Sequence, residues 1–279
     1  MSATSAGKTS AGKTQSPRSG ETGVRTTTTG DRLKALGRAE FALLVRNRTA
    51  LFTALFVPLG MIVAIRESLG RIDLGDTGFS VIEASMTGGI GMVLVMAVYG
   101  SLTSAYTARR EELVLKRLRT MEASDREILI GTALPAAGLA FAQSAVMIAA
   151  GVAFLDVRAP QQPVVLAGGL LIGLVLLSAL AAATSAVTRT VESAQITIMP
   201  LFMVSVVGSG LFVPLEALPE RVASVCELLP VTGVMTLIRA GWLGGAEGND
   251  LLGAALSALV WTILSVFAVQ RWFRWEPRR

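Results

Sequence analysis

The sequence has no histidine and only one cysteine, Cys226. Without histidine, the chain lacks the commonest general base and the commonest metal ligand. A single cysteine excludes an internal disulfide and any metal site built from cysteines. Charged residues are also scarce, at 16% against about 25% in soluble domains. We therefore expect no catalytic residue, no metal site, no cofactor bound by this chain and no soluble domain of ordinary size.

In place of charge the sequence has long apolar runs, and its mean hydropathy is +0.60. A run of about 17–25 apolar residues is long enough to cross the hydrocarbon core of a bilayer as an α-helix. Six candidate runs lie at about 49–65, 84–106, 130–154, 164–187, 196–213 and 251–269. The sequence therefore predicts an all-α integral membrane protein with six transmembrane helices.

Lysine and arginine are distributed unevenly among the segments that join these spans. With the N-terminus placed inside, the inner segments hold 20 of the 25 basic residues, and the outer segments hold the other 5. Cytoplasmic loops are usually enriched in Lys and Arg. We therefore predict a multi-pass protein of the plasma membrane with both termini in the cytoplasm.

The polar N-terminal region divides into two parts. Residues 1–30 are low-complexity Ser, Thr, Gly and Lys, which predicts a disordered tail before a transmembrane domain at 31–279. Within the tail, Gly7–Thr14 matches the phosphate-loop pattern G-x-x-x-x-G-K-[ST]. That loop binds phosphate only between a buried strand and a helix, so we assign it no nucleotide. Residues 31–48 mix leucines with basic residues, which predicts an amphipathic helix on the inner membrane surface.

A charged island at residues 107–130 separates the second and third runs. It carries six basic and five acidic residues, with apolar residues between them close to helical spacing. Ser124 and Glu127 form an S-x-x-E capping box, which predicts that a new helix begins there. We expect a short amphipathic helix, a turn and the start of a span. Such a helix can be pushed or pulled by something outside the membrane, whereas the simpler interpretation is a solvated loop that only sets topology.

The outer segment between the fifth and sixth runs, residues 214–250, is too long for a simple turn. Apolar residues recur at helical spacing within 215–229, and Pro230 ends that pattern. A second short helix is expected at about Thr232–Trp242, before a Gly-Gly pair. We predict two short helices that fold back onto the outer membrane surface or between the spans.

Four local patterns occur in a characteristic order along the chain. They are RAEFALLVRNRTALFTALFVPLGM (38–61), EELVLKRLRTMEASDREILIG (111–131), GSGLFVPLEALPERV (208–222) and LLPVTGVMTLIRAGWLGG (228–245). Together they resemble the membrane subunit of type-two ATP-binding-cassette (ABC) exporters, the permease family that includes bacterial drug and antibiotic efflux permeases. The first pattern is similar to that family's connecting helix and first span, and the second to its coupling segment. The resemblance covers the chain from about residue 32 onward.

The resemblance implies that a separate cassette subunit binds ATP and magnesium and hydrolyses the nucleotide. It implies a working unit of two membrane subunits, identical or different, and two cassettes, in contact with membrane lipid and not with nucleic acid. It also implies that the helix of the charged island is a coupling helix that docks on the cassette. Candidate docking residues are Leu115, Leu118 and Met121 for apolar contact, and Arg117 and Arg119 for charge complementarity.

Polar residues are few within the runs, so a substrate path is only weakly marked. Ionisable residues inside spans are usually functional, and the runs are almost free of them, which favours a hydrophobic or amphiphilic cargo over a small ion. Polar candidates for the path are Gln143, Ser144, Ser205 and Ser209, with hydrogen bonding between helices as the alternative role. Closely spaced glycines, such as Gly169 and Gly173, predict close helix approach within the chain or at a dimer seam.

Three other interpretations compete with the exporter. A secondary transporter or channel calls for ion-coupling acids or paired broken helices near mid-membrane, which the sequence does not show. An intramembrane metalloenzyme needs His or acidic ligands inside the spans, and the runs offer neither. A membrane scaffold or immunity protein without transport stays open on the sequence alone.

Overall fold

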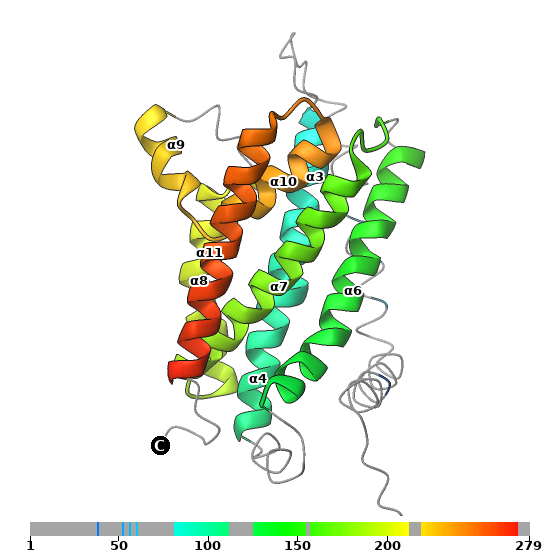
Figure 1. The fold of residues 1–279 in the computed structure, drawn as a ribbon. Helices are drawn as coiled ribbons and strands as arrows, with labels where there is room; N and C mark the ends of the chain where they lie inside the picture. Colours follow the sequence, from blue (N-terminus) through cyan, green and yellow to red (C-terminus); the bar gives the residue numbers. More distant parts are fainter. Residues whose placement is uncertain are drawn as a thin grey trace, which may run out of the picture.

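The computed structural model describes residues 81–111, 125–154, 157–211 and 219–272, together with Arg38, Phe52, Phe56 and Gly60. Outside its turns, this part of the chain is helical (Figure 1). The helices in chain order are α3 (Val81–Leu94), the π-helix η1 (Val95–Gly100), α4 (Ser101–Glu111), α6 (Asp125–Phe154), α7 (Pro163–Val187), α8 (Val191–Gly208), α9 (Glu220–Glu227), α10 (Thr232–Leu243) and α11 (Gly248–Trp272).

Five helical segments of the described residues are long and apolar enough to cross a membrane. The first consists of α3, η1 and α4 in succession, and the others are α6, α7, α8 and α11. These segments overlap the second to sixth predicted spans. The predicted first span at 49–65, the basic helix at 31–48 and the tail at 1–30 lie outside the described residues, apart from four isolated positions.

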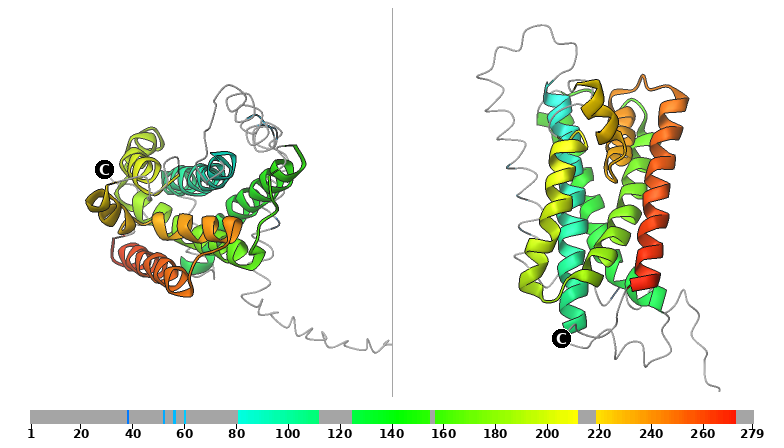
Figure 2. Two further views of the ribbon diagram at one scale, coloured as in Figure 1. Left: turned by 90° about the horizontal axis from the view of Figure 1, so that it is seen from above. Right: turned by 90° about the vertical axis from the view of Figure 1, so that its left-hand side faces the viewer.

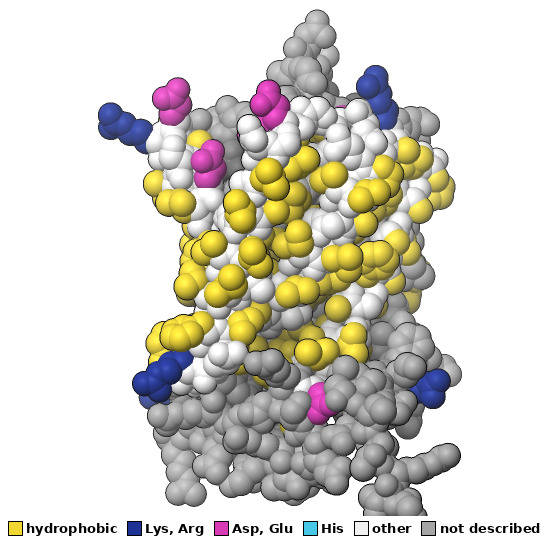
Figure 3. All heavy atoms as spheres, viewed as in Figure 1, with side chains coloured by type: hydrophobic (Ala, Val, Ile, Leu, Met, Phe, Trp, Pro, Cys, Tyr) yellow, Lys and Arg dark blue, Asp and Glu magenta, His cyan; other side chains and the backbone are white. Residues whose placement is uncertain are grey.

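An apolar belt covers the middle of the molecule, and charged side chains gather at its upper and lower edges (Figure 3). Large apolar side chains in the belt are more than half exposed, among them Val164, Leu171 and Val175 on α7 and Ile263 and Phe267 on α11. Soluble monomers rarely expose a contiguous apolar surface of this extent. The belt is therefore the surface that meets lipid.

Helices α9 and α10 follow one another at an angle of 101°, as in a re-entrant pair. Helix α10 is buried along almost its whole length, where it packs against α7, α11 and α3. Figures 1 and 2 place it inside the bundle, close to the end at which α11 begins. The predicted helix between the spans is thus confirmed for α10, and Gly244, with φ +73°, ends it.

Helices α7 and α10 pack closely because two glycines of α7 have no side chain at the interface. A Cβ atom added to Gly169 would lie 2.9 Å from Leu237 Cβ, and one added to Gly173 would lie 2.7 Å from Val234 Cγ1. Both distances are too short for real contacts, so glycine is what lets the two helices pack closely. The close approach predicted at these two glycines is confirmed, and it lies within the chain.

Candidate functional site

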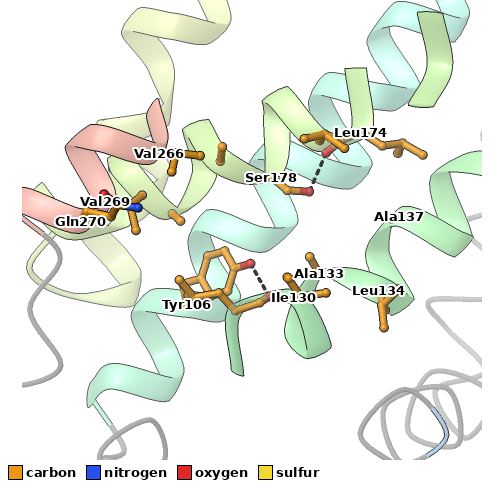
Figure 4. Close-up of a pocket in the computed structure, with 14 residues that line it drawn as sticks. Tyr106, Ile130, Ala133, Leu134, Ala137, Leu174, Ser178, Val266, Val269 and Gln270 are labelled. Carbon is orange, nitrogen blue, oxygen red and sulfur yellow. Dashed lines mark hydrogen bonds between the residues drawn. The ribbon is translucent and has the colours of Figure 1, made fainter. Parts of the chain in front are cut away.

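A cavity of about 950 Å³ lies between α4 and α6 on one side and α7 and α11 on the other (Figure 4). Its walls come from the beginning of α6 and from the later parts of α4, α7 and α11. It therefore lies toward the end of the bundle at which α4 stops. Four of its apolar lining residues, Ile130, Leu134, Val175 and Val266, are exposed, so the cavity opens toward lipid.

The described part of the cavity wall is almost entirely apolar. Most of the described lining residues are Leu, Ile, Val or Ala, and no acidic or basic side chain is among them. The hydroxyl of Tyr106 donates to the Leu129 carbonyl at 2.9 Å, and Ser178 Oγ donates to the Leu174 carbonyl at 2.6 Å. Since both hydroxyls are satisfied by backbone, the amide of Gln270 is the main polar group presented at the edge of the cavity (Figure 4). Ligand pockets commonly enclose about 300–1,000 Å³ and have mostly apolar walls.

The four polar residues expected to mark a substrate path lie elsewhere. Gln143 and Ser144 are on α6, whereas Ser205 is on α8 and Ser209 caps the C-terminus of α8. Helices α6 and α8 lie on opposite sides of the bundle (Figures 1 and 2), so the structure does not bring the two pairs together. None of the four lines the cavity.

Two of these serines bond within their own helices. Ser144 Oγ donates to the Ala140 carbonyl at 2.9 Å, and Ser205 Oγ donates to the Leu201 carbonyl at 2.7 Å. A hydroxyl that bonds the carbonyl four residues earlier is common inside helices. These two buried hydroxyls therefore have hydrogen-bond partners within their own helices and need none from a cargo.

Sequence reasoning missed the cavity because alanine, leucine and valine carry no site signal of their own. The available signals were Ser178, a polar residue within the fourth predicted run, and Gln270, which directly follows the sixth. Neither was singled out, because the cavity arises from the spacing of four helices. No single stretch of sequence determines the spacing between four helices.

The expected docking residues fall in the segment between α4 and α6. Leu115, Arg117, Leu118, Arg119 and Met121 all lie outside the described residues. Docking at these positions therefore stays a prediction. The structure does describe the helix that leads into this segment, α4, and the helix that leaves it, α6.

Arg110 connects the end of α4 to the end of α7. Its side chain is fully buried, at 0% exposure. Nη1 donates to the Ser185 carbonyl at 2.7 Å, and Nη2 donates to the Thr188 carbonyl. Ser185 lies in the last turn of α7 and Thr188 is its C-cap. The last carbonyls of a helix lack intrahelical partners and form the negative end of its dipole, so a buried cation is well placed here. Each hydrogen bond of this charged type contributes about 1.5–3 kcal/mol.

The residues on either side of Arg110 contact two further helices. Glu111 Oε2 accepts from the backbone N–H of Val191, the first residue of α8, at 3.2 Å. A carboxylate is favourable there because the first N–H groups of a helix are unpaired and carry partial positive charge. Arg109 Nη1 donates to Thr132 Oγ1 on α6 at 2.9 Å. Three successive residues at the end of α4 thus contact α6, α7 and α8 in turn.

These helices define a class of protein: a multi-pass α-helical membrane protein with an apolar intramembrane cavity and a re-entrant helix pair in its described part. The chain belongs to the ABC-2 type transporter family, whose sequence profile matches residues 31–243. It is the permease component of such a transporter, and the ATPase lies in a partner ATP-binding cassette subunit. A comparison with curated proteins finds no match.

Proposed function

We propose that this permease exports a hydrophobic or amphiphilic cargo across the plasma membrane. The cavity between α4, α6, α7 and α11 is the observation that supports the proposal, because it offers a large apolar volume open toward lipid. A molecule that already partitions into the bilayer can enter such a cavity without crossing water. Drugs and antibiotics of apolar character are the cargo class that we expect.

Ion-coupled transport fits the described helices less well. Glu83, Glu111, Glu127, Glu192 and Asp250 each lie within three residues of an end of a spanning segment. Proton and ion pathways use acidic residues deeper in the membrane, usually at the interior of a bundle. ATP hydrolysis by a cassette outside the membrane therefore fits this distribution of acidic residues better than ion coupling does.

The remaining parts of the proposal concern partners and orientation. The segment 112–124 docks on the cassette through Leu115, Arg117, Leu118, Arg119 and Met121, and both chain termini are cytoplasmic. A second permease subunit, identical or different, completes the membrane part. Magnesium and ATP bind in the cassettes, and their closure moves the permease between inward-facing and outward-facing states.

Purification of the tagged full-length chain from its source membranes tests the proposal directly. We expect a cassette subunit to co-purify and the complex to hydrolyse ATP, while the permease alone does not. Leu118→Asp is expected to leave membrane insertion intact and to abolish cargo-stimulated ATP hydrolysis, because a carboxylate would replace the apolar docking contact.

Leu228→Asp is the matched control, since it makes the same change at an exposed side chain beside α9, away from the docking segment. Equal loss of ATP hydrolysis in both variants would contradict a specific docking role for Leu118. A wild-type chain that never retains a cassette subunit would contradict the exporter itself.

A further inference from the structure

We infer that Arg110 and Glu111 form a joint that makes the α7–α8 turn move together with the docking segment. The joint consists of these two residues of α4 and the helix ends that they hold, Ser185 and Thr188 of α7 and Val191 of α8. The inference rests on the proposed function, because the force that the joint carries comes from the cassette. It adds the route by which that force reaches α7 and α8. Neither of these helices is joined directly to the docking segment in the sequence.

Sequence connectivity alone links the docking segment only to α4 and α6. A push on residues 112–124 acts directly on Glu111 before it and on Asp125 after it. Helices α7 and α8 are joined to each other by a turn of three residues, 188–190, on the same end of the bundle. Something must therefore hold this turn to α4 if α7 and α8 are to follow the cassette.

The contacts at this turn are complementary in charge at both helix ends. The Arg110 cation meets the negative end of α7, and the Glu111 carboxylate meets the positive end of α8. If the two charges were exchanged, each would face a helix end of its own sign. The sequence order Arg110 then Glu111 therefore matches the chain order in which α7 ends and α8 begins. Because Arg110 is fully buried, water competes little for its bonds.

The same joint bears on the cavity. Tyr106 on α4 and Ala182 on α7 both line the cavity, each within four residues of a joint residue. If α4 and α7 are held together at their ends, this part of the wall moves as one body.

The test uses Arg110→Met, which keeps a flexible unbranched stem and removes both donors and the charge. Glu111→Ala, at a partly exposed position, is the second variant should Arg110→Met fail to fold. Arg189→Met is the matched control, because Arg189 is an exposed arginine in the same turn. Allosteric coupling is typically worth about 5–150-fold. We therefore expect at least a roughly fivefold fall in cargo moved per ATP hydrolysed, with cassette binding retained.

A second measurement needs no cassette. Spin labels at Ala105→Cys on α4 and Glu192→Cys on α8, in a Cys226→Ser background, report the α4–α8 distance in nanodiscs. We expect one narrow distance distribution in the otherwise unchanged chain, a broadened one with Arg110→Met or Glu111→Ala, and recovery toward the narrow one with Arg110→Lys. Arg189→Met should leave the distribution narrow.

An unchanged distance distribution together with an unchanged ratio of cargo to ATP in both joint variants would overturn the inference. A stability loss with an unchanged ratio would also overturn it, since that is the result of a purely structural contact. Failure of the wild-type chain to bind a cassette is a separate result. It removes the exporter proposal, and the distance measurement still decides whether the joint holds the helices together.

Discussion

The guanidinium of Arg239 donates a hydrogen bond from Nη2 to the carbonyl of Gly210. This contact joins the re-entrant helix α10 to the turn that follows α8, 29 residues earlier in the chain. Gly210 has φ +73°, and a Cβ atom added to it would lie 2.8 Å from Arg239 Nη1. The turn therefore needs glycine both for its backbone conformation and for the space that the guanidinium occupies.

Gly210→Ala should destabilise the protein by more than its backbone conformation alone would require. The left-handed conformation costs a non-glycine residue about 1–2 kcal/mol, and the new methyl group also displaces Arg239. Gly245→Ala is the control, because Gly245 has φ +75° but no neighbour within 4 Å of an added Cβ. Thermal unfolding in detergent should show the larger loss for Gly210→Ala; an equal loss would mean that Arg239 readily moves aside.

Gly241→Ala should disrupt the packing of α10 against the start of α7. A Cβ atom at Gly241 would lie 2.4 Å from the backbone nitrogen of Leu166, and backbone atoms cannot yield as a flexible side chain can. The Gly241 carbonyl also accepts from Gln162 N–H at 2.9 Å, so a shift would weaken that bond too. Overpacking of this kind typically costs about 1–3 kcal/mol or somewhat more.

Thermal unfolding again provides the measurement for Gly241→Ala. Gly168→Ala on α7 is the control, since an added Cβ there has no neighbour within 4 Å. Alanine in a helix interior is favoured over glycine by about 1 kcal/mol, so the control should be neutral or stabilising. Equal stability of the two variants would show that this helix seam is looser than described.

Ala179→Phe should fill part of the cavity and weaken cargo binding. Ala179 lines the cavity on α7, and a phenyl group there competes with an apolar ligand for the same volume. A loss of about 1.4 kcal/mol corresponds to a roughly tenfold weaker affinity. Leu171→Phe, at an exposed position on the same helix that does not line the cavity, should bind cargo normally. Binding of a fluorescent apolar dye to the purified permease distinguishes the two, and equal binding would place the cargo elsewhere.

The predicted orientation is testable with single cysteines in a Cys226→Ser background. Arg117→Cys should react with a membrane-impermeant maleimide only after the cells are opened. Glu247→Cys, exposed in the turn before α11, should react in intact cells. The reverse pattern would invert the topology and separate the docking segment from any cytoplasmic ATPase.

Long apolar runs made the spans predictable, because a helix is the simplest way to satisfy backbone hydrogen bonds inside a bilayer. The predicted runs at 130–154 and 164–187 correspond closely to α6 and α7. The ends were less predictable. Helix α4 continues through Thr107 to Glu111, into residues that the sequence assigned to the charged island.

Arg110 shows why local charge is a poor guide to burial. Its neighbours in sequence are charged, which indicates a solvated position, yet its side chain is fully buried. What decides its location is the set of unpaired carbonyls at the end of α7, 75 residues later for Ser185. A signal was present in that later stretch, since α7 ends at Val187, before Thr188, without a C-terminal glycine to help satisfy those carbonyls.

The π-helix Val95–Gly100 was not predicted either, because its composition matches that of the α-helical residues around it. A π-turn bonds five residues apart where an α-turn bonds four apart. An extra residue in the ladder advances everything beyond it by about 100° around the axis. The directions in which Arg109, Arg110 and Glu111 leave the helix axis therefore depend on the π-helix midway along the segment Ile82–Glu111. Deletion of one residue between 95 and 100 would keep Arg109, Arg110 and Glu111 in the chain. It would rotate all three away from their present partners on α6, α7 and α8.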